Sequence, residues 1–372
     1  KNRITGLKNS ANDDNKWIVR DILHFDTEQR ELLVQTAGRD STISPYYQDV
    51  CRVNIDSGEL ISLVEGPYEH IVFAPHRPQM LIAVAYGLDV PGINGVAPSG
   101  NYVVTTRSRV DMLPVSLLLD REGKEVLTLE TAQDVGLSEN WYWPEPVAVK
   151  GVDGETDLYG VIYRPPDFSP EKTYPVLDYS LAIPYSSLLP QGSFITDTHC
   201  GDSYLMGAAY AALGFIVVAF DLPGMPYRDK AFQDRCYGSM SSVNAFEDRI
   251  SSFRQLAKRY PYMDLNRVGI VGCDYVTGAV YGLLEHPDFY KVGVMSAFDD
   301  SRFGIASIVE MYEGITPPER PYTDEMVSSL KGKLLLMHGL RDVFAPPETT
   351  LQLADALQKA NKDFDMILEP EG

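Results

Sequence analysis

The chain has 372 residues, of which 44% are hydrophobic and 23% charged, as in globular proteins large enough for two separate cores. Its 32 Lys and Arg against 52 Asp and Glu give a formal net charge of −20. Such a surface repels nucleic acid and anionic lipid, so we expect neither as a partner. No apolar run approaches the roughly 18 residues of a membrane span. The composition therefore predicts a globular protein with no membrane span in this segment.

The four cysteines, Cys51, Cys200, Cys236 and Cys273, show none of the Cys/Cys or Cys/His spacings of a zinc site. We expect no metal and no cofactor, and a disulfide between two of the cysteines remains open. The chain begins without Met on a polar segment and stops abruptly at Gly372. We interpret it as a piece of a longer protein.

Residues 17 to about 131 predict β structure throughout, because short runs of β-forming residues alternate with turn signals such as Asp56-Ser-Gly-Glu. The predicted strands are Trp17–Phe25, Glu31–Thr36, Val50–Ile55, Ile71–Ala74, Met80–Tyr86, Tyr102–Ser108 and Val115–Leu119. The turn signals recur at the rhythm of propeller blades, and about three blades would fit. A β-sandwich is the alternative. We favour a propeller whose other blades lie upstream.

The pattern changes at Trp141-Tyr-Trp-Pro-Glu-Pro146, after which strands alternate with helices. Alternation of this kind is typical of a doubly wound α/β domain with a mostly parallel sheet. The predicted strands are Pro175–Tyr179, Phe215–Ala219, Val268–Val271 and Leu334–His338, and the predicted helices are Val243–Tyr260 and Glu348–Asn361. The predicted domains are therefore 1–143, the C-terminal part of a propeller, and 144–372, an α/β domain.

A strand, a tight turn and a helix start are predicted in the segment that runs from Arg267 to Gly278. In α/β-hydrolases this junction carries G-x-S-x-G, a strained elbow that presents the nucleophile beside a helix N-terminus. Here Gly272 fills the first small position, Asp274 the nucleophile position and Val276 the second small position. Alone, the pattern is weak, and an ordinary strand-turn-helix is the better explanation of it.

The surrounding sequence resembles the dipeptidyl-peptidase IV branch of the prolyl oligopeptidase family. The similar stretches include the approach to the elbow, the strand after it, the acid-bearing region and the entry into the α/β domain. They are Arg259–Ile270, Pro287–Val294, Leu330–Gly339 with Ala356–Met366, and Asp153–Gly160 with Tyr174–Asp178. The resemblance implies an α/β-hydrolase preceded by a propeller, a Ser-Asp-His triad and removal of dipeptides from peptide N-termini. It also favours an exported protein and a homodimer.

Transferred residue by residue, the resemblance places Asp274 at the nucleophile and Asp342 at the triad acid. The oxyanion tyrosine of the family corresponds to Leu181, which offers no donor, and Val276 replaces the elbow glycine. The catalytic histidine would follow shortly after Gly372. Asp342 can equally be a structural aspartate that caps its own loop. If the triad alignment is right, the carboxyl groups of Asp274 and Asp342 should lie within about 12 Å, the span of one bridging histidine.

Two further residues match the part of the family's pocket that holds the substrate. Tyr312 and Glu310 lie in Val309-Glu-Met-Tyr-Glu-Gly314, which is similar to the family's Glu-x-Tyr-x-Gly. Tyr312 can equally be a packed core aromatic. The other histidines of the chain lie at positions that cannot replace the missing one.

The sequence therefore predicts a serine-peptidase fold whose chemistry is impaired and which acts by binding a peptide or a protein. One alternative is an active hydrolase that uses Asp274 as the nucleophile, as haloalkane dehalogenases and epoxide hydrolases use an aspartate. Another is residual activity of the serine-peptidase family by a different route. Whether the protein is an enzyme stays open on sequence alone.

Overall fold

The computed structural model describes residues 17–73, 94–137, 139, 141–180, 187, 189–194, 203–238, 244–273, 278–298, 312, 314, 323–343 and 345–370. The chain divides into two compact units. Unit 1 consists of Lys1–Ser138 with two later segments, Pro190–Leu205 and Tyr227–Lys230. Unit 2 holds Glu139–Leu189, Met206–Pro226 and Ala231–Gly372.

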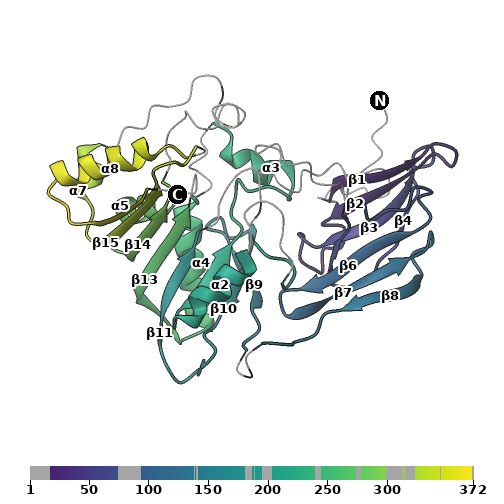
Figure 1. Ribbon diagram of the computed structural model, residues 1–372, viewed down its shortest axis with the longest axis horizontal. Coiled ribbons are helices and arrows are strands. Elements are labelled where there is room, and N and C mark those ends of the chain that lie inside the picture. The colour runs from purple at the N-terminus through teal and green to yellow at the C-terminus, as the bar shows by residue number, and fades with distance from the viewer. Residues whose placement is uncertain are drawn as a thin grey trace. The chain divides into compact units, whose positions relative to one another are not determined.

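Unit 1 contains two four-stranded antiparallel sheets, each with its strands in chain order (Figure 1). The first sheet is β1 (Ile18–Asp26), β2 (Glu31–Ala37), β3 (Gln48–Asn54) and β4 (Leu60–Ser62). The second is β5 (Glu69–Ile71), β6 (Val103–Arg109), β7 (Met112–Leu119) and β8 (Glu125–Thr131). A four-stranded sheet of neighbouring antiparallel strands is the form of a propeller blade.

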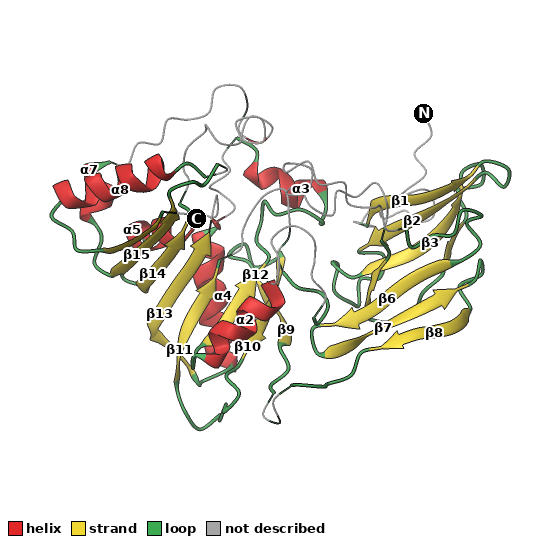
Figure 2. Ribbon diagram, viewed as in Figure 1, coloured by secondary structure: helices red, strands yellow, loops and turns green. Residues whose placement is uncertain are grey.

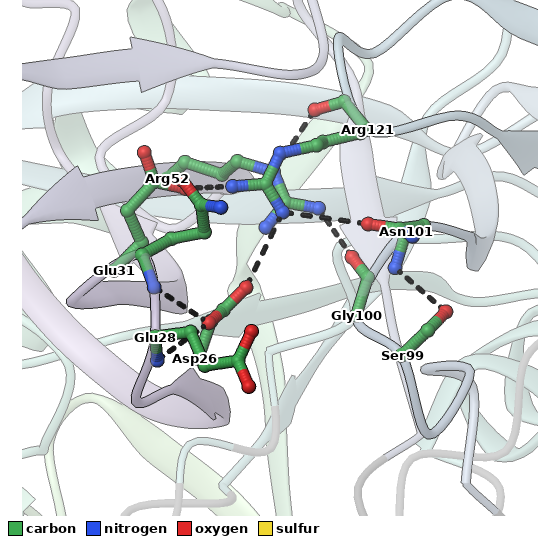
Figure 3. Close-up of polar contacts among 9 residues, drawn as sticks. Asp26, Glu28, Glu31, Arg52, Ser99, Gly100, Asn101 and Arg121 are labelled. Carbon is green, nitrogen blue, oxygen red and sulfur yellow. Dashed lines mark hydrogen bonds and ion pairs between the residues drawn. The ribbon is translucent and has the colours of Figure 1, made fainter.

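A buried arginine joins the two sheets of unit 1 (Figure 3). Arg52 of β3 is 5% exposed, and its Nε donates to the carbonyl oxygen of Arg121 at 2.9 Å. Its Nη2 donates to the carbonyl oxygen of Gly100, and Arg121 is in turn paired with Glu31. The turns of the second sheet are therefore bound to the middle of the first. Apolar residues of both sheets also share one core, among them Leu33, Val50, Val103, Leu117 and Leu119.

Five of the strands predicted in unit 1 match observed strands to within a few residues, and a sixth, Ile71–Ala74, overlaps β5 only at Ile71. The seventh, Met80–Tyr86, lies outside the described residues. Two strands were not predicted. The first, β4, is only three residues long, and every residue of the second, β8, is exposed, so neither carries the alternating pattern that marks a half-buried strand.

Unit 2 is built on an eight-stranded sheet in the order β16-β15-β14-β13-β11-β12-β10-β9, in which only β10 runs opposite to the others. Its strands are β9 (Glu145–Lys150), β10 (Asp157–Tyr163), β11 (Tyr174–Tyr179), β12 (Ile216–Phe220), β13 (Met263–Cys273), β14 (Tyr290–Ser296), β15 (Lys333–Gly339) and β16 (Asp365–Glu369). Four of them were predicted. The predicted strand Val268–Val271 is the buried end of β13, whose earlier residues are partly exposed and polar.

Helices connect these strands, as Figure 2 shows. They are α2 (Ser203–Ala212), α3 (Lys230–Gln233), α4 (Phe246–Arg259), α5 (Gly278–Glu285), α7 (Asp324–Ser328) and α8 (Pro347–Lys359), with a 3-10 turn η1 (Asp234–Cys236). Predicted inward residues of α4 and α8, such as Phe253 and Leu357, are fully buried. No helix in the described part of the chain is both long and apolar enough to cross a membrane.

The helices cover both faces of the sheet, as a doubly wound fold requires. Neighbouring residues of β11 point to opposite faces. Asp178 contacts Arg249 of α4, whereas the next residue, Tyr179, packs its ring against Tyr210 of α2 at 5.5 Å. Helices α4 and α2 therefore lie on opposite faces, which confirms the predicted α/β class.

An aromatic cage holds the start of unit 2. Arg164 is only 8% exposed, and its guanidinium lies between 5.4 and 5.6 Å from the centres of four aromatic rings. The rings belong to Tyr142, Phe168, Tyr260 and Tyr262. Its Nη2 also pairs with Glu145. The Trp141–Pro146 stretch, where the sequence pattern changes, is thus anchored by cation–π contacts and an ion pair.

Candidate functional site

The carboxyl ends of the parallel strands form the edge where the sequence predicts chemistry. Cys273, the last residue of β13, is in register with Ser296 of β14, and Ser296 is in register with Met337 of β15. Ligands of open α/β sheets bind at this edge. Because β14 separates β13 from β15, those two strands lie about 10 Å apart, two strand spacings.

The structure describes the strand before the elbow and the helix after it, but not the elbow residues themselves. Strand β13 ends at Cys273 and α5 begins at Gly278, as the sequence predicts for a strand-turn-helix. Asp274 and Val276 lie between them, outside the described residues, and the predicted distance from Asp274 to Asp342 stays a prediction. Leu181 and Glu310, which the sequence analysis assigns to the site, also lie outside the described residues.

Gly278 brings α5 into close contact with Ser180, the residue after β11, and with Asn244. A Cβ atom at Gly278 would lie 2.6 Å from Ser180 Oγ and 2.9 Å from Asn244 Oδ1, distances too short for any side chain to occupy without a shift. This close approach is made at the first described residue of α5.

A buried charge pair lies on the same face of β11 as Ser180. Arg249 Nη1 donates to Asp178 Oδ1 at 2.6 Å, and both side chains are 0% exposed. The hydroxyl of Tyr290 donates to Asp178 Oδ2 at 2.7 Å. Burial raises the pKa of Asp178, while the charge of Arg249 opposes that rise. These contacts tie β11, α4 and β14 together beneath the strand ends.

The predicted triad acid makes a hydrogen bond inside its own loop. Asp342 Oδ1 accepts from the backbone N–H of Ala345 at 2.9 Å, and Asp342 is partly exposed. His338 is buried beneath this loop, with Nε2 donating to the carbonyl oxygen of Ala345 and Nδ1 close to Thr350 Oγ1, both at 2.7 Å. The loop contact agrees with the structural interpretation of Asp342. It leaves the catalytic interpretation untested.

Tyr312 is partly buried and packs against the main apolar core of unit 2. Its carbonyl oxygen accepts from the N–H of Gly238 at 2.6 Å. This placement agrees with a packed aromatic. The assignment of Tyr312 and Glu310 to a substrate pocket stays a prediction.

Three cysteines are described, namely Cys51, Cys236 and Cys273, and only the last is exposed. Cys273 directly precedes the nucleophile position. Burial raises the pKa of Tyr210 on α2, and the charge of Cys273 adds to that rise. Among the described residues, no group of three or more His, Cys, Asp and Glu side chains is arranged to hold a metal ion.

Sequence reasoning did not find the polar residues beneath the strand ends. Asp178 and Arg249 are 71 residues apart, so no local pattern pairs them. One signal was available: an aspartate inside a short apolar strand must find a partner if the strand is buried. That signal identifies Asp178 but not Arg249 or Tyr290.

Comparison with known proteins agrees with this architecture. Residues 203–372 match the sequence model of the prolyl oligopeptidase family. Human dipeptidyl peptidase 8 is 28% identical over 243 residues, which cover 61% of this chain and 26% of that protein. The probable dipeptidyl-aminopeptidase B of Emericella nidulans is 25% identical over 342 residues, 88% of this chain and 34% of that protein.

The fold is shared with solved dipeptidyl peptidases. The crystal structure of Porphyromonas gingivalis dipeptidyl peptidase 4 superposes with a TM-score of 0.72 at 22% identity, covering 95% of this chain and 46% of that one. The chain thus spans between a quarter and a half of the length of these relatives. Its fold is that of an α/β-hydrolase with part of a β-propeller, residues 203–372 are similar to the prolyl oligopeptidase family, and dipeptidyl peptidases are among the proteins that the chain resembles.

Proposed function

We propose that this protein is a catalytically impaired dipeptidyl-peptidase homologue that binds a peptide or a protein at the carboxyl edge of its sheet. The observation that carries the proposal is Asp274, the first residue after β13, where the family has its serine. A carboxylate that attacked a peptide would form a mixed anhydride instead of an acyl ester. Its charge would also repel the developing oxyanion.

Two other substitutions support the proposal. Leu181 has no hydroxyl to donate where the resemblance implies an oxyanion tyrosine, and loss of one such donor typically lowers kcat by about 10²–10³. Phe344 stands where the resemblance implies an asparagine near the substrate. Because these changes affect separate parts of the machinery, restoring the serine alone would leave most of the barrier in place.

The binding half of the proposal is tested with a defined peptide. A tripeptide with proline in its second position, titrated into the protein in a calorimeter, should bind and be recovered intact. The titration should be repeated with Tyr312→Ala, which should weaken binding if Tyr312 lines the pocket. Absence of measurable heat with Xaa-Pro and Xaa-Ala tripeptides alike would remove the peptide as the ligand.

The rival hydrolase that uses Asp274 as nucleophile makes a different prediction. An epoxide or haloalkane probe would form an alkyl ester on Asp274 and raise the intact mass of the protein by the mass of the transferred group. We expect no such adduct. An adduct that disappears in Asp274→Asn would establish the rival.

A further inference from the structure

A cluster of buried polar atoms lies within unit 2, where the end of β11 meets the starts of α4 and α5. Ser180 follows β11, Asn244 lies two residues before α4, and Gly278 is the first residue of α5. An atom at the Cβ position of Gly278 would lie 2.6 Å from Ser180 Oγ and 2.9 Å from Asn244 Oδ1. Because one water molecule bridges polar atoms up to about 5.6 Å apart, it can contact both of these oxygens.

Both oxygens are buried and lack a hydrogen bond. Ser180 is 0% exposed and Asn244 is 3% exposed. Within the described part of the chain, no group forms a hydrogen bond with Ser180 Oγ or with Asn244 Oδ1. A buried polar atom without a partner has lost its hydration and gained no bond in exchange, and native proteins contain few of them. Two such atoms side by side therefore indicate a third group that binds between them.

Arg249 contributes an unpaired donor to the same cluster. Its Nε donates to the carbonyl oxygen of Asn244 at 3.2 Å, and its Nη1 donates to Asp178 Oδ1 at 2.6 Å. The third nitrogen, Nη2, is buried and has no partner among the described residues. Because the guanidinium is planar and rigid, Nη2 stays beside the two residues that the other nitrogens contact. One of these is Asn244 itself, and the other lies two residues before Ser180 on the same face of the strand.

The hydrogen-bonding character of the three atoms identifies the ligand. Arg249 Nη2 only donates, Asn244 Oδ1 only accepts, and the hydroxyl of Ser180 does either. A water molecule can accept from Arg249, donate to Asn244 and form its third bond with Ser180. Buried waters typically make about three such bonds to groups that would otherwise be unsatisfied. An anion would instead face the amide oxygen of Asn244 and lie near the carboxylate of Asp178, which repel it.

We propose that this cluster binds one internal water molecule between Ser180 Oγ, Asn244 Oδ1 and Arg249 Nη2. The water connects the end of β11 with the starts of α4 and α5, and it satisfies the three buried groups together. None of these residues is assigned to peptide binding. The water site therefore stands or falls independently of the proposed function.

A crystal structure of the unchanged protein, at a resolution that shows ordered waters, provides the direct test. We expect a single density peak within about 3.2 Å of all three atoms. Ser180→Val removes the hydroxyl and fills its space with methyl groups, so the peak should be absent from that variant. In solution, oxygen-17 relaxation dispersion counts the long-lived internal waters, and Ser180→Val should lower that count by one.

The matched control is Ser252→Ala on α4. Ser252 is also 0% exposed, but its hydroxyl already donates to the carbonyl oxygen of Asp248 at 2.7 Å. This variant should keep both the density peak and the water count of the unchanged protein.

Three results would overturn the proposal. The first is a structure of the unchanged protein in which Ser180 bonds directly to Asn244, or another side chain occupies the position, in place of the peak. The second is anomalous density at this position after a bromide soak, which would identify an anion. The third is an equal water count in Ser180→Val and the unchanged protein. The first two results need only the unchanged protein, so they decide the proposal even if Ser180→Val does not fold.

Discussion

Removal of the buried cation beneath the strand ends gives the most demanding prediction. Arg249→Met would leave the carboxylate of Asp178 fully buried, with the hydroxyl of Tyr290 as the remaining partner among its observed hydrogen bonds. Breaking one side of a buried ion pair typically costs about 3–5 kcal/mol. We expect a loss of that size in the free energy of unfolding at pH 8, measured by urea denaturation and circular dichroism.

The pH dependence of the unfolding free energy shows whether the buried charge of Asp178 causes this loss. Burial already raises the pKa of Asp178, and without Arg249 the pKa should rise further. A carboxyl group with a raised pKa in the folded state stabilises the fold at low pH and loses that contribution as the pH rises through the folded pKa. The deficit of Arg249→Met should therefore be smaller at pH 5 than at pH 8.

A double variant separates charge from packing. Asp178→Asn with Arg249→Met keeps an oxygen that can accept from Tyr290 but removes the buried charge, so it should recover at least half of the lost stability. A deficit that is the same at both pH values and is not relieved by the double variant would refute the electrostatic reasoning. The loss would then come from the missing packing of the long side chain.

Three other predictions concern Gly278, Arg164 and His70. Gly278→Ala places a Cβ atom 2.6 Å from Ser180 Oγ and should cost about 1–3 kcal/mol of unfolding free energy, which Ser180→Gly in the same chain should partly restore. Arg164→Lys should lower the melting temperature although the charge is kept, because an ammonium cannot stack flat among four rings; an unchanged melting temperature would contradict this. Burial lowers the pKa of His70 from 6.5 to about 4, so its neutral form stabilises the fold above pH 6.5 by about 3 kcal/mol. That stability should be lost as the pH falls from 6.5 to 4, and His70→Phe should flatten the curve over this window.

The fold could be predicted largely from the sequence, because periodicity reports burial. The apolar runs at β11, β12 and β15 and the one-sided helix α4 identified the α/β class and most of its elements. What could not be predicted depends on contacts between distant residues. The return of Pro190–Leu205 to unit 1 rests on hydrogen bonds to residues 81 to 94 positions away, which leave no local pattern.

The sequence could predict where the elbow lies along the chain, but not which distant residues pack around it. Strand β13 and helix α5 bracket Asp274 where the motif predicts the elbow, since strand, turn and helix signals are local. The motif could not show that Gly278 makes the close contact with Ser180, nor that Asp342 accepts a hydrogen bond within its own loop. Both depend on how separate strands and loops pack against one another.

Turnover of a chromogenic Xaa-Pro dipeptide tests the central claim most directly. The assay compares the purified unchanged protein with Asp274→Ala and Asp274→Ser. We expect no release of chromophore by the unchanged protein or by Asp274→Ala. Only a trace is expected with the serine variant, because Leu181 provides no oxyanion hydrogen bond and the rate penalty for that loss is about 10²–10³. Turnover by the unchanged protein that disappears in Asp274→Ala would contradict the account, as would full activity from the serine variant alone.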